Sequence, residues 1–189
     1  PGSDAAWARN WTRRVDLTGV AWDQPMCGTL ISPRHILFAR HYQREKGDIL
    51  VFHDRRGKPV ARKLVKTLPV QGIQLPDLMV GLLEEDAPVS HYRVLPPRND
   101  WSTLLPGTGV LIADSESKLL TGTIGSVQPG VIVFSHDGAD NKHLREELAE
   151  GDSGHPSFLM LRGEPVLLET HTRGGPGSGP FVSDPLVFA

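Results

Sequence analysis

The chain has 189 residues, 39% of them apolar and 22% charged, and no apolar run approaches the ~18 residues that a membrane-spanning helix needs. We therefore expect a soluble globular protein with one large domain or two small lobes. The 20 basic and 22 acidic side chains leave a formal charge of −2, which disfavours a nucleic-acid partner, and the single cysteine, Cys27, excludes an internal disulfide and a cysteine-based zinc site.

Short apolar runs separated by turn residues predict β-strands along the first half of the chain. These runs cover residues 18–22, 28–31, 36–38 and 78–83. Between them, two further runs at 49–52 and 60–65 flank a Gly- and Pro-containing turn, which is the pattern of a β-hairpin. The paired prolines and polar residues of 94–100 disfavour both helix and central strand, so we expect a boundary between lobes there.

The second half repeats the pattern of short strands. Its apolar runs cover residues 109–113, 119–124, 131–134, 157–161, 166–170 and 181–182. Residues 141–150 contain strong helix formers after a capping Asn141, which predicts a short helix, and the Gly-rich stretch 174–180 predicts a flexible loop. Strands at this spacing in both halves predict an all-β sandwich or a pair of β-barrels.

Three short motifs carry side chains suited to acyl transfer. The Gly-Asp-Ser-Gly motif at 151–154 places Ser153 in a tight turn, which can expose a hydroxyl and leave neighbouring N–H groups for an oxyanion. His41 follows an apolar strand and is a candidate base for the serine's proton. Asp77 heads the apolar run 78–83, where a carboxylate needs a partner such as a histidine N–H. Each motif alone also fits an ordinary turn or a structural residue.

In the order His41, Asp77 and Ser153, these motifs resemble those of the trypsin/chymotrypsin-like serine protease family, and the chain is closest in character to its disulfide-poor bacterial members. The resembling stretches read Ile-Leu-Phe-Ala-Arg-His, Asp-Leu-Met-Val-Gly-Leu-Leu and Gly-Asp-Ser-Gly-His-Pro. The resemblance implies that Ser153 is the nucleophile, that His41 is the general base and then acid, and that Asp77 orients it. It also implies an oxyanion hole built from the N–H groups of Gly151 and Ser153.

The same resemblance implies an all-β fold of two antiparallel β-barrels with the active site in the cleft between them. Residues 4–95 would then form the barrel that carries the histidine and aspartate, 96–103 a linker, and 104–189 the barrel that carries the serine. Residues 1–3 look like the remnant of a cleaved tag. The expected partner is a peptide or protein substrate, and the sequence shows no sign of a cofactor or of a metal site.

Several positions depart from the family pattern. Tyr42 follows His41 where many members have a cysteine, so the disulfide that would join it to the position of Cys27 is missing. Arg40 replaces the small residue that usually precedes the histidine. The chain does not begin with the apolar segment whose new amino terminus pairs with the aspartate of the serine motif, so we expect Asp152 to be held by other groups.

Three interpretations remain open for substrate specificity. Glu147, six residues before Ser153, resembles the base of the primary pocket, and an acidic floor would favour Lys or Arg side chains. His171 resembles a pocket-wall histidine that contacts an acidic substrate side chain in bacterial relatives, and Arg173 would assist it. Alternatively, Glu147 is simply solvated and His171 is a hydrogen-bonded strand residue.

The sequence thus predicts a serine endopeptidase that hydrolyses peptide bonds through an acyl-enzyme on Ser153. The alternative with the same fold is a pseudoprotease or zymogen-like binding module, in which the cleft is blocked or the oxyanion loop is collapsed. A β-barrel adaptor in which the motifs are chance turns is a further alternative.

Overall fold

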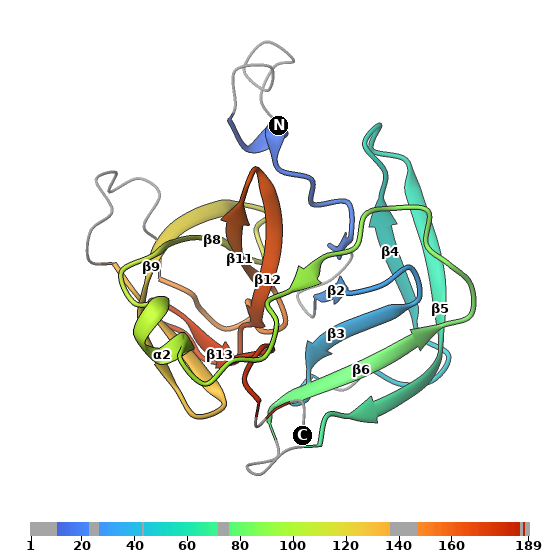
Figure 1. Ribbon diagram of the computed structural model, residues 1–189. Coiled ribbons are helices and arrows are strands. Elements are labelled where there is room, and N and C mark those ends of the chain that lie inside the picture. Colours follow the sequence, from blue (N-terminus) through green and yellow to red (C-terminus); the bar gives the residue numbers. More distant parts are fainter. Residues whose placement is uncertain are drawn as a thin grey trace.

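The first half of the chain forms one antiparallel barrel. In the computed structural model, which describes residues 11–22, 27–42, 44–71, 76–136, 147–185 and 187, its strand order is β1-β2-β3-β6-β5-β4. The strands are β1 (Val20–Ala21), β2 (Gly28–Leu30), β3 (His35–Ala39), β4 (Ile49–His53), β5 (Pro59–Pro69) and β6 (Leu78–Leu83). The first strand also lies against the last, β4, so the sheet curls round on itself (Figure 1).

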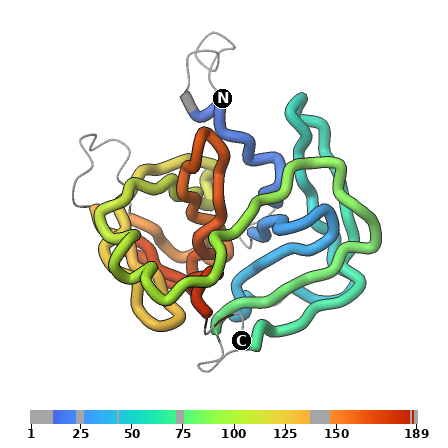
Figure 2. The backbone as a smooth tube through the Cα atoms, in the orientation of Figure 1, coloured from blue at the N-terminus to red at the C-terminus, as the bar shows by residue number. Residues whose placement is uncertain are grey.

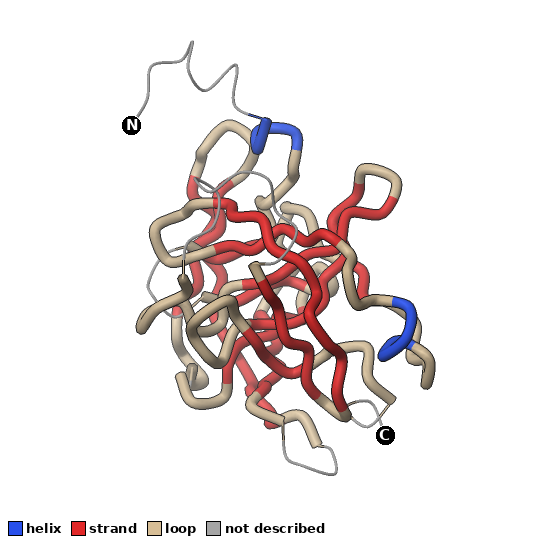
Figure 3. The backbone as a smooth tube through the Cα atoms, turned by 90° about the vertical axis from the view of Figure 1, so that its left-hand side faces the viewer, coloured by secondary structure: helices blue, strands red, loops and turns tan. Residues whose placement is uncertain are grey.

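The second half forms a sheet with the order β13-β10-β9-β8-β11-β12-β7, and it closes where β12 lies against β13. Its strands are β7 (Arg93–Val94), β8 (Gly109–Ala113), β9 (Leu119–Gln128), β10 (Val131–Ser135), β11 (Pro156–Leu161), β12 (Glu164–Thr170) and β13 (Ser178–Pro180). The two short helices among the described residues, η1 (Trp11–Arg14) and α2 (Trp101–Leu104), lie at the periphery of the strands (Figure 3).

The two halves of the chain occupy separate lobes, as Figure 2 shows by its colours. The strand β7 pairs in parallel with β12, so the chain has already joined the second sheet at 93–94, just before the predicted linker. The strands predicted between 18 and 170 are present, because the apolar alternation that indicated them is the inward face of each barrel.

Three predicted segments differ from the structure. Of the predicted helix 141–150, residues 141–146 lie outside the described residues, while Leu148 forms an isolated bridge with Gly175, whose carbonyl accepts its N–H at 2.8 Å. The Gly-rich stretch predicted as a loop contains β13, which pairs with β10, whereas the predicted strand 181–182 lies outside the strands. At Leu148 and along β13, pairing with distant segments outweighs the local preference for helix or loop.

Three apolar clusters hold the molecule together. One fills the first barrel and includes Leu30, Phe38, Phe52, Leu64 and Leu83. Another fills the second barrel and includes Ile124, Ile132, Phe134, Leu168 and Phe181. The third, here called the middle cluster, lies between the barrels and draws on both, with Leu37 and Leu78 from the first and Phe158, Leu167 and Val182 from the second. Burial of this apolar surface fixes how the barrels face each other.

A polar network around Asp16 ties the segment before β1 to the first barrel. Its carboxylate accepts hydrogen bonds from the hydroxyl of Ser90 at 2.6 Å, the guanidinium of Arg55 at 2.7 Å, and the hydroxyl and backbone N–H of Thr18 at 2.7 and 3.1 Å. Burial alone raises the pKa of this carboxyl, but the hydrogen bonds from Ser90, Arg55 and Thr18 outweigh it and lower the pKa to about 2.

Because the pKa of Asp16 is low, the free energy of unfolding depends on pH in the acid range. Because its folded pKa lies below the value of 3.8 expected when unfolded, the stabilisation is complete above that pH and is lost as the pH falls towards 2. The shift corresponds to about 2 kcal/mol, and we expect Asp16→Asn to lose it at neutral pH and to weaken the acid dependence. Denaturant unfolding at pH 3 to 7 measures this, with Asp100→Asn, an exposed partner of Arg98, as control. If the free energy of unfolding depended on pH in the same way for the wild type and Asp16→Asn, this would contradict the low pKa assigned to Asp16.

Candidate active site

The register of two neighbouring strands brings His41 and Asp77 together. Strands β3 and β6 pair in antiparallel fashion with Ala39 opposite Leu78, so the residues just after β3 meet the residue just before β6. Asp77 accepts two hydrogen bonds from His41, from the backbone N–H to Oδ1 at 2.8 Å and from Nδ1 to Oδ2 at 2.6 Å. Since an ionised carboxylate only accepts, the proton lies on Nδ1 and Nε2 is left as the acceptor. The side chains are 38% and 37% exposed, so a substrate can reach them.

The loop that carries Ser153 is held by Asp152. Its buried carboxylate accepts the backbone N–H of Ser115 at 2.8 Å and that of Ala149 at 2.7 Å. Burial acts to raise the pKa of Asp152, but hydrogen bonds from Ser115 and Ala149 outweigh it, so the pKa is lowered and the group stays ionised. The groups that hold Asp152 are therefore backbone N–H donors of the second barrel.

Two backbone N–H groups beside the Ser153 hydroxyl are available to a ligand. Within the described part of the chain, the N–H groups of Gly151 and Ser153 donate no hydrogen bond, although the N–H groups of Asp152 and Gly154 do, to Ala149 and His171. Gly151 and Gly154 have φ angles of +103° and +86°, a region that favours glycine, so the turn depends on both. Adjacent unused donors at a serine are the arrangement an oxyanion needs.

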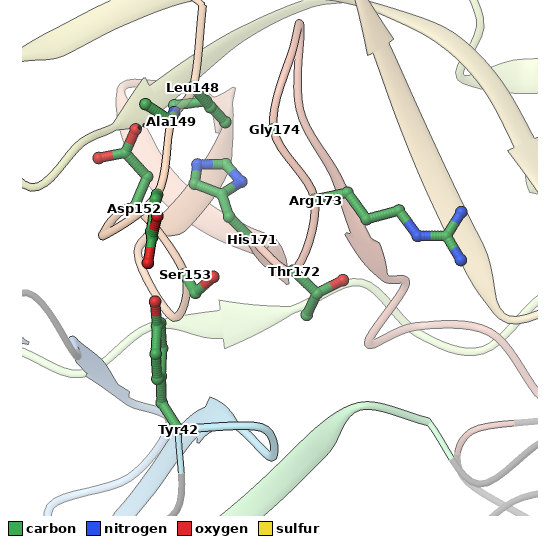
Figure 4. Close-up of a pocket in the computed structure, with 10 residues that line it drawn as sticks. Tyr42, Leu148, Ala149, Asp152, Ser153, His171, Thr172, Arg173 and Gly174 are labelled. Atoms are coloured by element: carbon green, nitrogen blue, oxygen red, sulfur yellow. Dashed lines mark hydrogen bonds between the residues drawn. The ribbon is translucent and has the colours of Figure 1, made fainter.

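The serine and the histidine come from different barrels. No hydrogen bond joins the Ser153 hydroxyl to His41 among the described residues, a contact that in many substrate-free enzymes tightens only when substrate binds. The ring of Tyr42, the residue after His41, packs against the histidine with centroids 4.5 Å apart. Figure 4 shows its hydroxyl pointing from the first barrel towards the serine loop.

A pocket of about 300 Å³ opens beside Ser153. It is lined by Tyr42, Leu148, Ala149, Glu150, Asp152, Ser153, His171, Thr172, Arg173 and Gly174. Glu147 is not part of this lining, because its carboxylate is 65% exposed and pairs with Nε2 of His136 at 3.1 Å. Figure 4 shows the ring of His171 behind the serine and the guanidinium of Arg173 directed away from it.

His155, two residues after the serine, is a buried neighbour of the site. Burial lowers the pKa of His155 to about 4. The charge of His171 also lowers this pKa, whereas the hydrogen bond to the Asp152 carbonyl acts to raise it. Its ring packs against Trp22 at 5.7 Å between centroids. The ring is therefore neutral at pH 7, and its place in the structure is a packing position behind the nucleophile loop.

The pocket also contains residues that the sequence does not mark as site residues, among them Tyr42 and Thr172, and Glu169 lies in contact with one of its lining residues, His171. The sequence marks Tyr42 only as the replacement of a cysteine, although it directly follows His41. Glu169 could have been noticed as a charged residue that interrupts the apolar run 166–168, two positions before His171.

No family model matches the sequence, and no curated protein matches it. Among solved structures, human heparin binding protein is similar, with a TM-score of 0.62 and 16% identity over 88% of this chain and 92% of that chain. The fold is chymotrypsin-like. The chymotrypsin-like fold confirms the prediction of two antiparallel β-barrels, whereas at this identity the roles of individual residues remain proposals.

Two further observations apply to the described residues alone. No group of three or more His, Cys, Asp and Glu side chains among them could hold a metal ion. None of the helices in the described ranges is long and apolar enough to cross a membrane.

Proposed function

We propose that this protein is a serine endopeptidase that acts through an acyl-enzyme on Ser153. The observation that carries the proposal is the 2.6 Å hydrogen bond between His41 Nδ1 and Asp77, which leaves Nε2 ready to accept a proton. Ser153 lines a pocket together with Tyr42, the residue that follows His41. The N–H groups of Gly151 and Ser153 support the proposal, because an oxyanion needs donors that make no other hydrogen bond, and these two make none within the described residues.

The chemistry assigns each group a role. Ser153 Oγ attacks the scissile carbonyl while His41 Nε2 takes its proton, and the negative oxygen binds to the N–H groups of Gly151 and Ser153. Protonated His41 then gives that proton to the leaving amine, and the acyl-enzyme remains on Ser153. A water molecule loses a proton to His41, attacks the ester, and releases the carboxylic acid as the proton returns to Ser153. Asp77 stays ionised and stabilises the imidazolium in each half.

The pocket lining favours an acidic substrate side chain over a basic one. His171 lines the pocket, whereas Glu147, the residue that would attract Lys or Arg, is paired with His136 outside it. Glu150 and Asp152 also line the pocket. Glu150 is exposed to solvent, which screens its charge, and the carboxylate of Asp152 is already held by the N–H groups of Ser115 and Ala149. Similarity in character to disulfide-poor bacterial proteases belongs to this proposal, supported by the lone buried Cys27 and by the backbone N–H groups that hold Asp152.

Labelling with a fluorophosphonate tests the proposal directly. Such a reagent bonds only to a serine activated by a base, so intact mass should show a single adduct on the wild type and none on Ser153→Ala or His41→Ala. Ser102→Ala, which removes a hydroxyl from α2, is the matched control and should label fully. An adduct that persists on Ser153→Ala, or a wild type that never labels, would sink the assignment.

The alternative is a binding module with this fold that does not turn over substrate. The missing Ser153–His41 hydrogen bond within the described residues is the observation that favours it. Residues 54–66, around the turn between β4 and β5 and along β5, carry six Lys and Arg side chains against one Asp, and the similar human protein is named for heparin binding. A protein that does not label but is retained on immobilised heparin, and released by salt, would support this alternative.

A further inference from the structure

Glu169 places a carboxylate in the interior, directly beneath the pocket. Neither of its oxygens is exposed, and neither makes an aligned hydrogen bond within the described residues. Its nearest charge partner is His171, whose Nδ1 lies 2.7 Å from Oε1. A buried charge of this kind is costly unless an opposite charge accompanies it. The imidazole of His171 is the group placed to supply that opposite charge.

The backbone makes room for this carboxylate. Strand β12 carries one extra residue, Leu168, between the partners of Ser157 and Phe158, and such an irregularity re-aims the next side chain. On the opposite side, Gly179 of β13 has no side chain, and a Cβ there would lie 2.0 Å from Glu169 Oε2. Any larger residue at position 179 would occupy the space that the Glu169 carboxylate now fills.

Both ring nitrogens of His171 face acceptors. Nε2 lies 3.2 Å from the carbonyl oxygen of Ala113, and Nδ1 lies 2.7 Å from Glu169 Oε1, although this second contact is not an aligned hydrogen bond. A neutral imidazole has only one N–H, so the doubly protonated ring is the form in which both contacts are attractive. The other ionisable groups around it are the buried His155, which follows the serine loop, and the pocket-lining residues Glu150, Asp152 and Arg173.

We propose that Glu169 is a positioning residue that keeps His171 protonated and fixed, so that the pocket presents the positive end of a buried ion pair to an acidic substrate side chain. His171 lines the pocket and Glu169 lies behind it, so the cation is the nearer charge for a bound carboxylate. This inference rests on the proposed peptidase function and on its preference for acidic side chains.

Paired substrates isolate this effect. Two peptides that differ only by Glu or Gln before the scissile bond are compared through the ratio of their kcat/KM values, in which the titration of His41 cancels. For the wild type the ratio should stay constant from pH 6 to 8. For Glu169→Gln the ratio should be about tenfold lower at every pH in this range, because a ring that is 1% exposed and has lost its counter-charge favours the neutral form. The exposed Glu164→Gln, on the same strand, should behave as the wild type.

A second measurement does not need activity. In the Ser153→Ala protein, nuclear magnetic resonance of the His171 ring nitrogens should report two attached protons from pH 6 to 8, and Glu169→Gln should reduce this number to one. A His171 ring with a single attached proton while Glu169 is present would overturn the inference even where the substituted protein does not fold. Failure of fluorophosphonate labelling would instead refute the peptidase, while leaving the ring measurement decisive for Glu169.

Discussion

Replacing Asp77 by Asn should lower peptidase turnover about 10⁴-fold with little change in the fold. The amide oxygen of Asn can still accept the backbone N–H of His41, which Asp77 now binds at 2.8 Å. Its NH₂ group, however, would donate to Nδ1 and so move the ring proton to Nε2. A ring protonated there cannot take the proton of Ser153, so the attack step loses its base.

The measurement is kcat on a peptide that the wild type cleaves, with thermal unfolding to show that the variant is folded. Asp100→Asn serves as the matched change, because Asp100 is also a carboxylate paired with a cation, Arg98 at 2.6 Å, but lies on the linker away from the cleft. It should retain wild-type kcat. Wild-type turnover in Asp77→Asn would show that this carboxylate does not orient the histidine.

Gly154→Ala should destabilise the protein by about 3 kcal/mol or more and displace the nucleophile loop. Gly154 has a φ angle of +86°, which costs an L-residue, and a Cβ built there would lie 2.5 Å from the carbonyl oxygen of Cys27. That oxygen belongs to backbone just before β2, so it cannot turn aside as a flexible side chain could. The loop or β2 must shift, and the Ser153 hydroxyl shifts with it.

Gly163→Ala separates the cost of the positive φ angle from the cost of the contact with Cys27. Gly163 has nearly the same φ angle, +85°, but a Cβ there meets nothing within 4 Å. It should therefore show the conformational cost alone, about 1 kcal/mol, and label with fluorophosphonate like the wild type. Denaturant unfolding of both variants gives the difference. Equal losses of stability would mean that the contact with Cys27 relaxes at no cost.

The strands and the order of the three motifs could be predicted because both are local properties. Apolar alternation indicates strands whatever their partners, and His41, Asp77 and Ser153 each sit in a short recognisable stretch. The placement of Glu147 could not be predicted in this way. Counting back from Ser153 assumes that chain position determines side-chain direction, whereas the structure turns this carboxylate towards His136.

Long-range pairing explains the remaining differences. Leu148 bridges to Gly175 across 27 positions, and β13 pairs with β10, so local helix and loop propensities do not decide these segments. The contact between Glu169 and His171 depends on an extra residue in β12 and on the absence of a side chain at Gly179. Neither feature leaves a periodic signal in the sequence.

The middle cluster is an apolar interior that both barrels share. Two barrels joined by a hinge would instead meet at an interface that water can enter. Leu37 lies four positions before His41, Leu78 directly follows Asp77, and Phe158 stands five residues after Ser153. Opening the cleft by rotating one half against the other would bring this apolar surface into water. For the proposed peptidase, this predicts that extended, unstructured stretches of polypeptide are cleaved more readily than folded surfaces.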